Sequence, residues 1–458
     1  MSTAFEGARG DLGRAIRAAA RPLELLKSRG TVSLLDQGIV SLANFLTGVL
    51  VARSCPKEEL GLYSLGFSVL LFCTGIQSAV ISVPYTIYSP QVAERERAAY
   101  SGSALVHQLA LSLLAAAVVG GGALVLDVTG QPGVAALLAA VALALPFPLA
   151  REYARQLLFA RLRFPSALAL DGAVAGLQFA LLLSLRRLGL LSARSAYAAV
   201  GAACGAGVLL AAMAVWRWFQ IRRERVLPDL RANWATGRWA LTGGMVGLAG
   251  QQLYPWFLAA TRGTAEAGAL AACTGITFIA NPIIIGLGNL LVPKTVHAFA
   301  SGGVPALARV VRQGTLALAA VMAVVTPVML VAGRSLLGLV YGDRYLAYGL
   351  TVGLLSLSQA VDVVAVPAGC ALYAMEKPSA VVKGNAIVLA VTATLGLAFV
   401  HLLGPLGVAT GLLLGNGLSA AFRWREYARE LRARAARPEV SVPSSPARMA
   451  AVARRSSR

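Results

Sequence analysis

The chain has 458 residues, of which 57% are hydrophobic and only 13% are charged, and its mean hydropathy is +0.70. Soluble domains carry about 25% charged residues, so this composition excludes a soluble enzyme or binding module and predicts an integral membrane protein. In a soluble protein, the net charge of +21 would suggest nucleic-acid binding. In a membrane protein, basic residues collect in cytoplasmic loops, which explains the same charge without a nucleic-acid partner.

Apolar segments along the chain predict an all-α fold with about 12 transmembrane helices, because each segment is close to the length that spans a bilayer. A basic segment, 1–30, comes first and lacks the apolar core and cleavage site of a signal peptide, which predicts a cytoplasmic tail. The last segment, 423–458, is basic without apolar periodicity, which predicts a disordered cytoplasmic tail. The spans are expected near 31–53, 60–89, 103–126, 133–150, 166–185, 196–216, 239–261, 269–292, 313–340, 347–373, 384–403 and 405–422.

The first span carries polar side chains within its apolar run, namely Asp36, Gln37 and Asn44. An ionised carboxylate near the centre of a span costs at least about 2.5–3.5 kcal/mol, and a purely structural anchor has no use for one. We therefore expect this helix to face a polar interior. In the alternative interpretation, Asp36 lies near the cytoplasmic end of the helix, where it pairs with Arg29 or caps the helix.

Two later spans also contain acidic residues beside amides. Asp171 and Gln178 are seven residues apart and share one helical face, and Gln359 precedes Asp362 by three residues. Acidic residues inside membrane spans are functional-site hypotheses by default, so we expect both pairs to line a polar cavity. The alternative for Asp171, which lies near the start of its span, is a structural ion pair with Arg163.

An internal repeat relates the two halves of the chain. The segment 34–45 aligns with 240–251, and one residue of slip later 57–66 aligns with 264–273. Each half holds six spans, so both halves begin on the same side of the membrane and the repeat is parallel, with its axis along the membrane normal. The matched positions include Gly38 with Gly244, Val40 with Val246, Leu42 with Leu248, Ala43 with Ala249, Glu59 with Glu266 and Gly61 with Gly268.

The distribution of basic residues predicts the orientation and the domain boundaries. With the N-terminus inside, 33 of the 41 Lys and Arg residues lie on the cytoplasmic side, so both termini are expected in the cytoplasm. We expect an N-terminal six-helix lobe at 31–216 and a C-terminal six-helix lobe at 239–422. The basic stretch 217–238 is then a cytoplasmic linker between them.

Several stretches resemble a known transporter family: LLDQGIVSLANFLTGVLVAR, CPKEELGLYSLGFSVLL, ISVPYTIYSP at 81–90 and QQLYPWFLA at 251–259. They are similar to bacterial polysaccharide-biosynthesis transporters, the O-antigen and exopolysaccharide flippases of the multidrug/oligosaccharidyl-lipid/polysaccharide (MOP) superfamily. The resemblance covers roughly residues 30–423. It implies a MATE-like, V-shaped pair of six-helix bundles around a central cavity, working by alternating access.

The resemblance also implies a function. Family members are flippases that move undecaprenyl-diphosphate-linked oligosaccharide across the bacterial inner membrane for polysaccharide export. The implied partners are the lipid-linked oligosaccharide, membrane lipid, a polysaccharide polymerase and other assembly proteins. In the related multidrug (MATE) transporters, an acidic residue of the first span takes part in cation coupling. Asp36 would accordingly bind H⁺ or Na⁺, with oxygens from Gln37 and Asn44, and no other cofactor is expected.

A diphosphate head group needs cationic partners, and its sugars need aromatic or amide groups. Arg151 and Arg155 follow the fourth span on the cytoplasmic side, and Arg238 precedes the seventh. The planar guanidinium suits phosphate oxygens, although positive-inside topology explains the same arginines. Candidates for contacts with the head group near span ends, where aromatic residues are also typical interface anchors, are Tyr85, Gln251, Gln252 and Tyr254.

Two other functional classes make different predictions. A cation-coupled multidrug exporter of the MATE type would need a cavity with aromatic and acidic residues and no phosphate-binding arginines. A membrane-embedded glycosyltransferase or polymerase would need large extramembrane loops with catalytic motifs. The longest internal connection, 217–238, has 22 residues and is basic, so we expect a protein that is not an enzyme.

Overall fold

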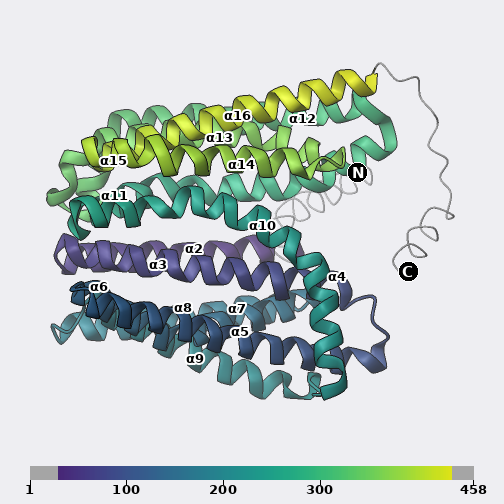
Figure 1. Ribbon diagram of the computed structural model, residues 1–458, viewed down its shortest axis with the longest axis horizontal. Helices are drawn as coiled ribbons and strands as arrows, with labels where there is room; N and C mark the ends of the chain where they lie inside the picture. The colour runs from purple at the N-terminus through teal and green to yellow at the C-terminus, as the bar shows by residue number, and fades with distance from the viewer. Residues whose placement is uncertain (1–28, 436–458) are drawn as a thin grey trace, which may run out of the picture.

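The computed structural model describes residues 29–435, and this part of the chain is helical almost throughout and forms no strand. Figure 1 shows two groups of helices that lie side by side along their length. The N-terminal group contains α2 (Arg29–Ser54), α3 (Lys57–Gln77), α4 (Val83–Tyr88), α5 (Glu94–Val128), α6 (Pro132–Ala144), α7 (Pro146–Ala160), α8 (Phe164–Arg187) and α9 (Ala193–Val215). The C-terminal group contains α11 (Thr264–Thr277), α12 (Asn281–Tyr341), α13 (Gly349–Ala374), α14 (Pro378–Val391), α15 (Leu397–Leu403) and α16 (Pro405–Ala435). Between them, α10 (Arg223–Arg262) runs from the first group to the second (Figure 1).

Within residues 29–435, nine helices are long and apolar enough to cross a membrane, and the bent pair α6 and α7 makes ten. The long run Thr264–Tyr341 counts as two because it turns back on itself, and α10 is a further helix of sufficient length, so the predicted all-α fold with about twelve membrane helices is confirmed. Several crossings are interrupted helices. A π-helical turn, Ser78–Ser82, joins α3 to α4, another, Thr392–Gly396, joins α14 to α15, and α6 and α7 form one span bent by 40°. The run Thr264–Tyr341 is 78 residues long, which is far too long for one crossing.

That long run turns back on itself inside α12, where the backbone leaves helical geometry. Gly302 has φ −139° and ψ 16°, and Gly303 has φ 59° and ψ −151°. A positive φ is readily available to glycine. The helix therefore forms a hairpin whose first arm completes the eighth crossing and whose second arm is the ninth.

Several helices extend beyond the predicted span ends. Most of the predicted linker 217–238 is helical, because α10 already begins at Arg223. The C-terminal tail, predicted to be disordered from residue 423, is helical as far as Ala435, where α16 ends. Residues 1–28 and 436–458 of the two predicted tails lie outside the described residues.

The two groups meet where α3 crosses α11, at a pair of glycines. A Cβ added to Gly61 would lie 3.0 Å from the backbone nitrogen of Gly268, and a Cβ added to Gly268 would lie 3.0 Å from that of Gly61. Each would also collide with a carbonyl oxygen, that of Thr264 or of Lys57 respectively. Gly61 and Gly268 are matched positions of the predicted repeat. Their reciprocal contact is the one expected where two parallel repeats meet at their common axis.

Polar contacts close the two groups against each other at the same end of the bundle. Arg53 donates to the last carbonyl oxygens of α12, and Arg344 donates to the carbonyl oxygen of Cys55 at 2.8 Å. The Lys57 ammonium lies 5.2 Å from the centre of the Tyr348 ring. We call these contacts, together with Gly61 and Gly268, the outer seal. They lie where α2 ends and α3 begins, which the charge distribution predicts to be the outer side of the membrane.

The helix α10 packs on both groups. Near its start, Asn233 accepts a hydrogen bond of 2.8 Å from Tyr100 of α5. Further along, the carbonyl oxygen of Gly250 accepts a hydrogen bond of 2.7 Å from Thr392 of the C-terminal group. The helix bends between these two contacts, as Figure 1 shows. One continuous helix thus connects the inner part of the N-terminal group to the C-terminal group.

Candidate functional site

A cavity of about 640 Å³ lies within the N-terminal group. Its walls come from α2, α3, α7, α8 and α9, and α10 closes it on the side of the C-terminal group. The residues from α2 and α8 lie in the first two-thirds of helices that start at the end opposite the outer seal, so the cavity occupies the middle of the bundle and the part away from the seal. Its wall includes Gln37, Asn44, Phe67, Leu70, Thr74, Arg151, Glu152, Arg155, Asp171, Gln178, Cys204, Met245 and Leu248.

One wall of this cavity is charged: it is formed by Arg151, Glu152, Arg155 and Asp171, with Asp36 behind them. Arg155 of α7 contacts three carboxylates of this charged wall. Its Nε lies 2.8 Å from Oδ2 of Asp36 and 3.0 Å from Oδ2 of Asp171. Its Nη1 lies 3.2 Å from Oε1 of Glu152, and its Nη2 donates to Oε1 of Gln37 at 3.2 Å. The rigid fork of one guanidinium therefore joins α2, α7 and α8.

A second arginine, Arg151, completes the charged wall. Its Nη2 lies 2.6 Å from Oδ1 of Asp171, and its Nε donates to the same oxygen at 2.9 Å. The side chains of Asp36 and Asp171 are fully buried, and buried carboxylates need such partners. With Glu152, three carboxylates face two guanidiniums, so the wall carries one negative charge in excess when every group is ionised. Within the described part of the chain, Oδ1 of Asp36 is buried without a hydrogen-bond partner.

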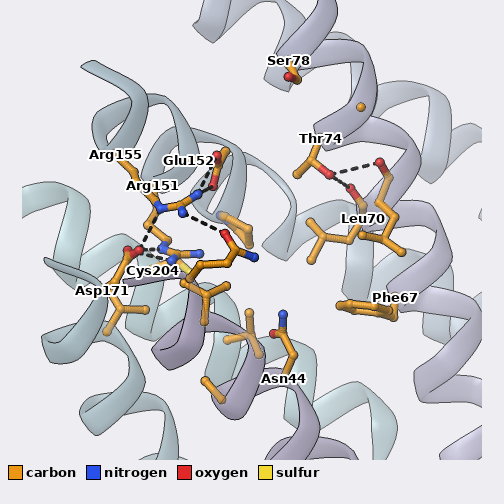
Figure 2. Close-up of a pocket in the computed structure, with 18 of the residues that line it drawn as sticks. Asn44, Phe67, Leu70, Thr74, Ser78, Arg151, Glu152, Arg155, Asp171 and Cys204 are labelled. Carbon is orange, nitrogen blue, oxygen red and sulfur yellow. Dashed lines mark hydrogen bonds and ion pairs between the residues drawn. The ribbon is translucent and has the colours of Figure 1, made fainter. Parts of the chain in front are cut away.

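The opposite wall of the cavity is mainly apolar. Figure 2 shows the charged side chains of α7 and α8 gathered on one side, with Phe67, Leu70 and Thr74 of α3 facing them across open space. The Thr74 hydroxyl donates to carbonyl oxygens of its own helix, at 2.9 Å for Leu70 and 3.0 Å for Leu71. A charged wall opposite an apolar one suits a ligand that has both polar and apolar parts.

The structure brings together the candidates from the first and fifth spans. Gln37, Asn44, Asp171 and Gln178 line the cavity, and Asp36 lies directly behind them on Arg155. Both acids have arginine partners on α7. Asp36 pairs with a residue 119 positions away in the sequence, and Asp171 pairs with arginines of α7. Arg163, the alternative partner of Asp171, instead lies 4.9 Å from the centre of the Trp218 ring.

The expectation that Arg151 and Arg155 lie beyond the end of the fourth span is wrong. The bent span continues through α7 to Ala160 and carries both arginines along the cavity. Their charges are tolerated there because Asp36 and Asp171 supply buried partners. Both arginines therefore remain candidates for head-group binding, at a deeper position than predicted.

The candidates of the tenth span lie in the C-terminal group, apart from the cavity. Gln359 donates to Asn281 at 2.6 Å, and Asp362 pairs with Arg423 of α16 at 3.3 Å. Arg423 also donates to Asn385 at 2.9 Å. The C-terminal group thus has a smaller polar network of its own, with one carboxylate and one guanidinium.

The remaining head-group candidates do not line the cavity. Tyr85 is 1% exposed and hydrogen-bonded to Ser101 at 2.8 Å, and Tyr254 is 0% exposed, so both pack inside the protein. Gln251 and Arg238 are exposed on α10, and Gln252, next to Gln251, is half-buried. The span-end pattern of these residues did not reveal which face of the helix each one occupies.

Sequence reasoning missed Glu152, Thr47 and Arg423. Glu152 lies between Arg151 and Arg155 in the sequence, so its charge is hidden in an apparently cytoplasmic basic stretch. Thr47 accepts a hydrogen bond of 2.8 Å from Gln178, and this bond joins α2 to α8. Arg423 was assigned to the tail because it follows the last apolar segment.

The charged wall is not arranged as a metal site. Among the described residues, no group of three His, Cys, Asp or Glu side chains could hold a metal ion. Arg155 occupies the space between Asp36 and Asp171 that a bound cation would need.

The chain is similar in structure to several transporters, although its sequence matches no family model. No protein-family model and no curated protein matches the chain. The chain is similar to the inward-facing conformation of a multidrug resistance MATE family transporter of the MOP superfamily, with a TM-score of 0.68 and 16% identity over 86% of this chain and 94% of that one. For an outward-facing conformation of such a transporter, the TM-score is 0.60, with 15% identity over 88% of this chain and 94% of that one.

A third similar structure is a MOP superfamily transporter from Pyrococcus furiosus, for which a binding pocket of reverse polarity suggests a different function. The TM-score is 0.62, with 14% identity over 89% of this chain and 95% of that chain. These matches extend over nearly the whole length of both proteins. The chain therefore has the two-lobed, all-helical fold of MATE transporters of the MOP superfamily.

Proposed function

We propose that the protein is a flippase of the bacterial inner membrane, which moves undecaprenyl-diphosphate-linked oligosaccharide for polysaccharide export. One observation carries the choice of substrate: two arginines, Arg151 and Arg155, line the cavity, and among the described residues that line it Phe67 is the one aromatic side chain. Guanidinium groups bind phosphate oxygens through paired hydrogen bonds. A cavity for organic cations would instead need aromatic and acidic residues without such arginines.

The outer seal supports alternating access as the mechanism. The two groups touch at the outer seal, and the cavity lies on the other side of it. In the orientation predicted from the charge distribution, the cavity would then be open to a head group arriving from the cytoplasmic leaflet. The apolar wall of α3 would face the lipid-linked part of such a ligand. Opening of the seal, with closure at the inner side, would then expose the cavity outward.

The excess carboxylate supports coupling to protons. A proton taken up by this wall would balance its excess charge, so that the arginines would be shared among fewer anions. A diphosphate then competes with carboxylates for Arg151 and Arg155. Proton uptake and substrate capture would favour each other in this scheme, whereas substrate-free protein would retain its internal ion pairs.

The proposal is tested with purified protein in liposomes that contain a fluorescent undecaprenyl-diphosphate oligosaccharide, by following the fraction that a membrane-impermeant reagent reaches. We expect transbilayer movement with the native protein and a loss of at least tenfold for Arg151→Gln. The matched control, Arg186→Gln, changes an exposed arginine on α8 outside the cavity and should leave the rate unchanged. Native protein that moves no lipid-linked sugar under either pH gradient refutes the proposal.

A cation-coupled multidrug exporter is the second candidate, and a specific observation favours it. Arg151 and Arg155 contact three carboxylates, of which Glu152 and Asp171 line the cavity and Asp36 lies behind them, and this excess of carboxylates suits a cationic ligand or a coupling cation. In the same liposomes, efflux of a lipophilic cation such as ethidium, abolished by Asp171→Asn and accompanied by no movement of lipid-linked sugar, would establish this function in place of the flippase.

A further inference from the structure

A second cavity lies outside the charged wall, on the hairpin formed by α12. It is a groove of about 480 Å³ between the two arms, near the turn at Gly302 and Gly303. Pro293 and Ser301 line it from the first arm, and Ala306 lines it from the second. The hairpin turn lies at the end of the bundle opposite the outer seal, which is the end predicted to be cytoplasmic.

Two cationic side chains and one histidine, contributed by both arms, face this groove. Lys294 and His297 come from the first arm and Arg309 from the second, and all three are exposed. Within the described residues, none of these three side chains forms a hydrogen bond or an ion pair. The charges of Lys294 and Arg309 differ in this respect from those of Arg151 and Arg155, which are already shared with carboxylates.

Among the described residues, no acidic residue lines the groove, and none lies near it in the sequence. From residue 267 to residue 342 the sequence has no Asp and no Glu. The groove itself is lined by no carboxylate, and the Ser301 hydroxyl donates to the carbonyl oxygen of His297 at 2.9 Å. An anionic ligand would therefore meet unpaired cations without displacing an internal partner.

We propose that this groove binds the phosphate of an anionic phospholipid in the cytoplasmic leaflet. Two observations favour a lipid over a soluble phosphate. Val292 and Val296, beside the groove on the first arm, are 45% and 48% exposed, so apolar surface adjoins the cations. The first arm is also part of a membrane crossing, which places its cationic end at the depth of the lipid head groups. The site is separate from the proposed transport cavity, and it does not depend on the identity of the transported substrate.

If the groove is a binding site, a cation from each arm contributes to lipid binding. If only the total charge of the cytoplasmic surface matters, the position of the cations makes no difference. Each interfacial cation strengthens the binding of an anionic lipid by about fivefold. Replacing both Lys294 and Arg309 with Gln should therefore weaken the binding of phosphatidylglycerol by about 30-fold, while K294R/R309K should retain it. The control R425Q/R432Q removes the same charge from exposed positions at the same end of the bundle, on α16, and should change the binding by less than twofold.

The test is a titration of the purified, detergent-solubilised full-length protein with phosphatidylglycerol or phosphatidylcholine, with bound lipid measured by native mass spectrometry. The expected result is a preference of the native protein for phosphatidylglycerol that K294Q/R309Q removes and the control keeps. Equal losses in K294Q/R309Q and R425Q/R432Q would overturn the proposal, because only total charge would then matter. Displacement of the lipid by an equal concentration of inorganic phosphate would overturn it too, in favour of a soluble anion.

Discussion

Arg155 is the residue whose removal should destabilise the protein most. Among the described residues, it is the cation that contacts Asp36, whose side chain is 0% exposed. Arg155→Met keeps much of the volume and removes the charge, so that the carboxylate of Asp36 is left buried and uncompensated. Breaking a buried ion pair by removing one partner costs about 3–5 kcal/mol, and we expect a loss of unfolding free energy in that range.

Arg151→Met is the matched control, because it leaves Asp171 with a second cation, Arg155, at 3.0 Å. It should cost about 1.5–3 kcal/mol, the value of a charged hydrogen bond. The double variant Arg155→Met/Asp36→Asn removes both charges and should recover at least half of the loss. Unfolding in mixed detergent micelles, followed by helical circular dichroism, gives these energies. Equal stability of the two single variants, or no recovery in the double variant, would refute the assignment of Arg155 as the centre of the network.

Three other changes test the contacts between helices. Gly61→Leu should open the outer seal, because the Cβ of the leucine would collide with the backbone of α11. Cys55, which is 5% exposed in the native protein, should then react several-fold faster with an impermeant maleimide. Trp256→Phe removes the 2.7 Å hydrogen bond from Nε1 to Ser68 across the two groups; it should cost about 1 kcal/mol and raise Cys55 labelling less than Gly61→Leu does. Gln178→Leu removes a buried hydrogen bond between α8 and α2, and the unfolding free energy should fall by about 1 kcal/mol.

The membrane fold was largely predictable because the bilayer imposes a length and a polarity on every crossing. The same reasoning fails where a helix leaves the hydrocarbon. The connection expected between residues 292 and 313 is largely helical, with its turn confined to Gly302 and Gly303, and α16 continues to Ala435. Hydropathy reports the solvent that surrounds a helix, so it cannot mark the end of a helix that continues into water.

The sequence pointed to both the acids and the arginines of the candidate site, but it placed only the acids within membrane spans. Asp36 and Asp171 were identified because carboxylates inside spans are rare. Arg151 and Arg155 were assigned to a cytoplasmic loop because charge was taken as a sign of exposure, whereas their partners lie on other helices. An ion pair formed across 119 residues of sequence depends on the packing of α2, α7 and α8 and leaves no local pattern.

The position of α10 links the cavity to the outer seal. Residues of α10 between Ala240 and Leu248 line the cavity. About two turns further along the same helix, Trp256 donates a hydrogen bond to the Ser68 hydroxyl of α3. A flexible loop at this point would let the C-terminal group rock without changing the cavity. Because the connection is one helix, a rotation that separates Gly61 from Gly268 must also shift the wall formed by Ala240 and its neighbours. The free energy of ligand binding in the cavity is thereby expected to bias the outer seal, which is the coupling that alternating access requires.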